Sequence, residues 1–62
     1  MTKLSDVQAA AQKQANRERK TLVIYNLNPY SPLYVVRDYP EKAPSREAVE
    51  KLRDFVQFVD PA

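Results

Sequence analysis

The segment Thr21–Tyr39 constrains the fold most, because it contains two short runs of strand-forming residues separated by a turn. The first run, residues 21–26, is rich in β-branched and aromatic side chains, and the second covers residues 33–39. Pro29 and Pro32 lie in the connection, where proline is typical of turns and strand starts. The segment is therefore predicted to form an antiparallel hairpin.

Both faces of the first predicted strand are apolar. Leu22 and Ile24 point to one side, whereas Val23 and Tyr25 point to the other. A strand that is apolar on both faces is usually covered on both sides. The hairpin therefore needs more cover than one helix supplies, and its surplus apolar surface is the expected place of an interface.

Two helices are predicted around the hairpin, which makes a single α+β domain with the order α-β-β-α. Residues 1–20 are predicted to form a polar, basic helix or arm, and residues 21–62 the hairpin with an amphipathic C-terminal helix over Ser45–Val59. Ser45 is the expected N-cap of that last helix. Its apolar face is expected to pack on the hairpin, and it consists of Ala48, Val49, Leu52, Phe55, Val56 and Val59.

The composition of the 62-residue chain limits how it can be stabilised and what chemistry it can perform. It has no Cys, and a core of this size supplies only about 3–5 kcal/mol, so we expect a homodimer. Without His or Cys, no base is available to activate a serine, and we expect no catalytic residues, metal site, cofactor or small-molecule substrate. Gly is also absent, so left-handed backbone positions are expected on Asn or Asp.

No membrane segment is expected from the sequence. The longest apolar run, Leu22–Tyr25, is far shorter than the roughly 20 residues that a spanning helix needs. The first residues, MTKLSDVQ, contain no apolar signal region. We therefore expect a cytoplasmic protein that does not bind membranes.

The leading functional hypothesis is a small regulatory or accessory protein that binds nucleic acid, either DNA or RNA. The basic residues expected to contact phosphate are Lys13, Arg17, Arg19, Lys20 and Arg37. Tyr30 and Tyr34 are candidates for stacking on bases, as aromatic residues on strands often do in single-strand-binding proteins. The net charge of +2 is too small to favour nucleic acid by itself.

The alternative hypothesis is a protein-binding inhibitor or adaptor that docks through the hairpin loop and a strand edge. Tyr30, Tyr34 and Phe58 are its candidate partner-binding residues, because tyrosine is a favoured anchor and Phe58 lies off the apolar face of the predicted helix. In size and element order the chain resembles the small accessory proteins that phages and plasmids encode to regulate DNA or to modulate a host protein. No specific motif carries this resemblance.

Overall fold

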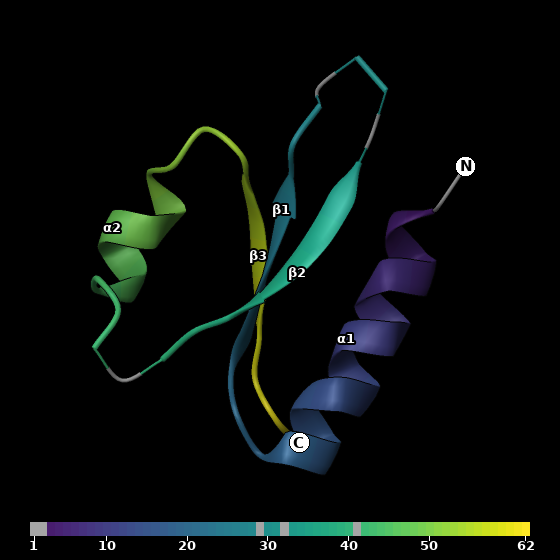
Figure 1. Cartoon of the computed structure of the whole chain (residues 1–62), viewed down its shortest axis with the longest axis vertical. Coiled ribbons are helices and arrows are strands. Elements are labelled where there is room, and N and C mark those ends of the chain that lie inside the picture. The colour runs from purple at the N-terminus through teal and green to yellow at the C-terminus, as the bar shows by residue number, and fades with distance from the viewer. Residues whose placement is uncertain (1–2, 29, 32, 41) are drawn as a thin grey trace.

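The fold is mixed α+β, with two helices and a three-stranded antiparallel sheet (Figure 1). The computed structural model describes residues 3–28, 30–31, 33–40 and 42–62. Its elements, in chain order, are α1 (Leu4–Glu18), β1 (Leu22–Asn26), β2 (Tyr34–Asp38), α2 (Arg46–Glu50) and β3 (Phe55–Val59).

The hairpin predicted around Thr21–Tyr39 is present, and β1 is the central strand of the sheet. The strand order is β2-β1-β3, and both pairings of β1 are antiparallel. Ile24 lies opposite Val36 of β2 and opposite Gln57 of β3. Leu22, Val23 and Ile24 are all buried, as expected for a strand with two apolar faces.

The predicted C-terminal helix over Ser45–Val59 is wrong, because only Arg46–Glu50 is helical and Phe55–Val59 forms β3. The Ser45 cap is confirmed, since its Oγ accepts a hydrogen bond of 3.2 Å from the Ala48 amide. The physical reason for β3 is that a two-stranded ribbon is marginal in water. A third strand pairs the second edge of β1, and the run FVQFV is rich in the β-branched and aromatic residues that strands favour.

Helix α1 covers one face of the sheet and thereby builds the main core. Val7, Ala11 and Ala15 form its buried row and pack with Leu22 and Ile24. Ala11 and Ala15 are almost completely buried, and their small side chains let the helix backbone approach the sheet closely. The N-terminal segment, predicted as a polar, basic helix or arm, therefore supplies the cover that we had assigned to the C-terminal helix.

The end of α1 uses an unexpected residue for its left-handed position. Arg19 adopts φ 52° and ψ 46°, and it has the single positive φ among the described residues. The Lys20 amide donates a hydrogen bond of 3.2 Å to the Ala15 carbonyl, as in a helix end closed by a left-handed residue. The expectation that such a position falls on Asn or Asp is wrong. The end of α1 requires a left-handed residue at position 19, and the chain has Arg there and no glycine anywhere.

The two helices lie on opposite sides of the sheet (Figure 1). Helix α1 contacts all three strands, whereas the five-residue α2 contacts β3. Within the described residues, no helix has both the length and the apolar composition needed to cross a membrane.

Candidate binding surface

Two asparagine side chains bind backbone amides among the described residues of the β1–β2 loop. Asn26 Oδ1 accepts hydrogen bonds from the amides of Asn28, at 3.2 Å, and Leu33, at 3.1 Å. Asn28 Oδ1 accepts from the amides of Tyr30, at 3.0 Å, and Ser31, at 3.3 Å. In a chain without glycine, these side chains take over the hydrogen bonding of the turn.

This loop exposes large apolar side chains. Tyr30 is 97% exposed, Leu33 56% and Leu27 48%. The Leu27 amide donates to the Leu33 carbonyl at 2.9 Å, so the two leucines lie side by side in the same loop as Tyr30. We call Leu27, Tyr30 and Leu33 the loop tip.

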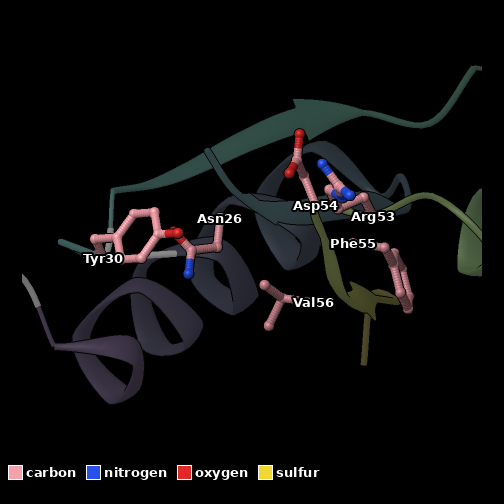
Figure 2. A pocket seen from close by; sticks show the side chains of 6 residues that line it. All are labelled: Asn26, Tyr30, Arg53, Asp54, Phe55 and Val56. Atoms are coloured by element: carbon pink, nitrogen blue, oxygen red, sulfur yellow. The ribbon is translucent and has the colours of Figure 1, made fainter. Parts of the chain in front are cut away.

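A groove adjoins the loop tip at the same end of the sheet. It is lined by Asn26, Tyr30, Arg53, Asp54, Phe55 and Val56. Figure 2 shows Asn26 and Tyr30 on one side, Arg53, Asp54 and Phe55 on the other, and Val56 between them. The groove therefore combines aromatic and aliphatic walls with one basic and one acidic side chain.

A bulge brings Phe55 and Val56 to this groove. The pairing of β1 with β3 shifts register between Ile24 and Tyr25, so that Ile24 faces Gln57 whereas Tyr25 faces Phe55. A bulge of this kind bends a strand and redirects its side chains. The Asn26 amide continues the pairing beyond the bulge by donating to the Asp54 carbonyl at 2.8 Å.

Phe58, a predicted partner-binding residue, is half-buried on the side of the sheet that faces α2. Its ring lies 5.2 Å from the Tyr39 ring and 5.1 Å from the Phe55 ring. The Arg46 guanidinium lies 4.9 Å from the centre of the Phe58 ring. These contacts attach the start of α2 to the sheet, and Phe58 is engaged within the fold.

The same arginine pairs with Asp60. Arg46 Nη1 donates to Asp60 Oδ2 at 3.1 Å, and Thr21 Oγ1 donates to Asp60 Oδ1 at 2.7 Å. Arg46 Nη2 also contacts Asp60 Oδ1. The hydrogen bonds from Arg46 first, and then from Thr21, lower the pKa of Asp60 to about 2. We call Thr21, Tyr39, Arg46, Phe58 and Asp60 the α2 clasp.

Tyr34, the other predicted partner-binding tyrosine, lies on the face of the sheet that α1 covers. It is half-buried and packs against the main core. Of the three predicted anchors, Tyr30 alone has nearly its whole side chain in solvent.

The predicted phosphate-binding residues do not form one surface. Lys13 and Arg17 are exposed and line a shallow depression on the outside of α1 with Ala10 and Gln14. Arg37 is exposed on β2, where it pairs with Val23 on the opposite side of the sheet from α1. Arg19 is exposed at the end of α1.

Lys20 lies between two carboxylates. Its Nζ is 3.1 Å from an oxygen of Glu18 and 3.1 Å from an oxygen of Asp38. Hydrogen bonding to Asp38, and then to Glu18, raises the pKa of Lys20, and the Lys20 hydrogen bond lowers the pKa of Glu18. The charge of Lys20 is therefore largely balanced by its neighbours.

Tyr30 was a candidate from the sequence, whereas the residues around it were not. Leu27 and Leu33 were visible as large apolar side chains flanking a turn, where polar residues are more common. Arg53, Asp54 and Phe55 were placed on a helix and were therefore separated from the loop. Their position beside Tyr30 depends on the pairing of β3 with β1.

In comparison with known proteins, the chain matches no family model, no curated protein and no solved structure.

Proposed function

We propose that this chain is a non-enzymatic, cytoplasmic protein-binding module, a regulatory inhibitor or adaptor that docks through the loop tip and the adjoining groove. The observation that carries the proposal is the exposure of Tyr30, 97%, on a loop whose backbone amides are held by Asn26 and Asn28. The partner that fits this surface is a protein with an apolar pocket for the phenol ring.

Hydrogen bonds that hold the amides of residues 28, 30, 31 and 33 favour binding, because less conformational freedom is then lost on docking. Each side chain or loop residue that must be immobilised at an interface costs free energy, which preorganisation reduces. Tyrosine is enriched among residues that dominate binding energy, since it brings a large apolar ring together with a hydroxyl group. Leu27 and Leu33 supply further apolar contact, and Arg53 and Asp54 can fix the orientation of the partner.

The first experiment is a pull-down from an extract of the cells that encode the chain, with nuclease treatment to remove bridging nucleic acid. We then purify the recovered protein and measure its dissociation constant directly. Tyr30→Ala is expected to weaken binding by at least about 30-fold, which corresponds to a hot-spot loss of about 2 kcal/mol.

Leu52→Ala is the matched control, because Leu52 is 52% exposed but lies outside the loop tip and the groove. It is expected to leave the dissociation constant within about twofold. Equal binding by the wild type and the Tyr30→Ala variant contradicts the proposal.

A second candidate function is nucleic-acid binding through the outer surface of α1. The supporting observation is that Lys13 and Arg17 lie one helical turn apart and together line the same exposed depression. A gel shift at low salt should then be weakened by replacing both residues with alanine and by raising the salt concentration. The absence of a shift with single- and double-stranded DNA and RNA would exclude this candidate.

A further inference from the structure

The hydrogen bonds between β1 and β2 determine which N–H and C=O groups of β2 point away from the sheet. The Leu27 amide bonds to the Leu33 carbonyl, and the Tyr39 amide bonds to the Thr21 carbonyl. In an antiparallel pair, hydrogen-bonded and non-hydrogen-bonded positions alternate. Residues 33, 35, 37 and 39 therefore bond toward β1. The N–H and C=O groups of Tyr34, Val36 and Asp38 point away from the sheet.

The helices leave this edge uncovered. The shortest dimension of the fold is 12 Å, which is close to two inter-strand spacings of about 4.8 Å each. The helices, which lie against the faces, therefore add little width beyond the sheet edges. Figure 1 looks along this dimension and shows β2 crossing in front of β1 and β3.

The edge has only some of the features that commonly prevent strand addition. Proteins block their edge strands with short length, charged side chains, proline, bulges or a covering segment. Strand β3 has a bulge and contacts α2. Strand β2 is short and ends in the charged residues Arg37 and Asp38, but it contains neither proline nor lysine and pairs with β1 in continuous register.

We propose that two copies of this chain pair through their β2 strands, antiparallel and centred on Val36. In this register the outward groups of Val36 bond to those of Val36 in the second copy, and those of Tyr34 bond to those of Asp38. Every outward N–H and C=O of β2 then has a partner. The product is one continuous sheet with the order β3-β1-β2-β2-β1-β3.

The side chains are compatible with this pairing. On the α1 side, Val36 meets its own copy, and Tyr34 lies beside Asp38. On the other side, Val35 lies opposite Arg37. Like charges directly opposite each other destabilise a strand pair, and this register places none opposite each other.

The pairing has consequences for both stability and binding. A 62-residue chain buries only about 60% of its unfolded surface, so association adds a substantial contribution. The two-fold axis through Val36 places the two loop tips at opposite ends of the joined sheet. The dimer therefore presents Tyr30 twice, facing away from itself, and can hold two partner molecules. The pairing itself does not depend on the proposed docking function.

The test combines sedimentation equilibrium with amide hydrogen exchange on the unmodified chain. We expect dimer formation to slow exchange at Tyr34, Val36 and Asp38 at least tenfold as the protein concentration rises from micromolar to millimolar. A single 7.2 kDa species at millimolar concentration overturns the proposal. A dimer in which these three amides exchange as fast as in an unstructured peptide also overturns it, because the contact then lies elsewhere.

A synthetic chain provides the matched control. N-methylation of the Val36 amide removes one outward donor and leaves the side chain and the β1 pairing intact, and we expect the dimer dissociation constant to rise at least tenfold. N-methylation of the Phe58 amide modifies the opposite edge, because Val59 and Gln57 are the β3 residues that bond toward β1. That variant should dimerise like the wild type. Equal weakening by both modifications argues against the β2 contact.

Discussion

Replacing Asn26 with alanine tests whether a single side chain organises the loop that presents Tyr30. The side-chain Oδ1 of Asn26 accepts from two backbone amides, those of Asn28 and Leu33, and so joins the end of β1 to the start of β2. A hydrogen bond contributes about 0.5–1.5 kcal/mol net, and these two are solvent-exposed, so the loss should be about 1–2 kcal/mol. For a domain of this size that corresponds to a fall in Tm of about 4–16 °C.

The assay is urea unfolding followed by circular dichroism, with the variant Asn26→Asp as the control. Aspartate keeps an oxygen acceptor at the same position and should recover most of the lost free energy of unfolding. The Leu33 amide should exchange faster with solvent in Asn26→Ala than in the wild type. Equal destabilisation by alanine and aspartate, or a loss below about 0.3 kcal/mol in Asn26→Ala, would refute the assigned role of these hydrogen bonds.

Three further predictions concern the helix end, the α2 clasp and the core. Arg19→Gly should raise the free energy of unfolding by about 0.5–1 kcal/mol in urea titrations, because glycine removes the steric cost of φ 52°. The folded-state pKa of Asp60, about 2, lies below its ordinary value of 3.8, so its ion pair stabilises the fold above pH 4 and the effect disappears as pH falls to 2. The effect should be below about 1 kcal/mol at this exposed site, seen as a steeper loss of stability from pH 4 to 2 in the wild type than in Asp60→Asn. Ile24→Ala should cost about 2–5 kcal/mol and abolish the cooperative thermal transition, whereas Ile24→Val should cost about 0.5–1.5 kcal/mol and retain it.

Local features of the sequence were sufficient to predict the hairpin and the Ser45 cap, and to place Tyr30 in the connection between the strands. Each depends on neighbouring residues: β-branched side chains on both sides of a proline-containing turn, and a serine before a helical turn. Tyr30 lies between Pro29 and Pro32, and prolines this close together disfavour both a helix and a strand at that position. Such properties need no knowledge of distant parts of the chain.

The third strand was decided by tertiary structure. The apolar residues of Phe55–Val59 fit the spacing of a helix that continues from Ser45, and they also fit a strand. The choice depends on the second edge of β1, whose backbone groups need partners that only a segment about 30 residues away provides. The residues near Phe55–Val59 in the sequence do not show that β1 needs these partners.

The sequence by itself therefore determined that the chain has a central ribbon with two apolar faces, and the tertiary structure decided which segments cover and extend it. Helix α1 covers the face of Leu22 and Ile24 because its alanines allow close approach. Strand β3 pairs with β1 because the backbone groups on the second edge of β1 need hydrogen-bond partners. That arrangement brings Phe55 and Arg53 beside Tyr30 and leaves the β2 edge open. The candidate interfaces are thus products of long-range packing, since both depend on which strands pair with β1.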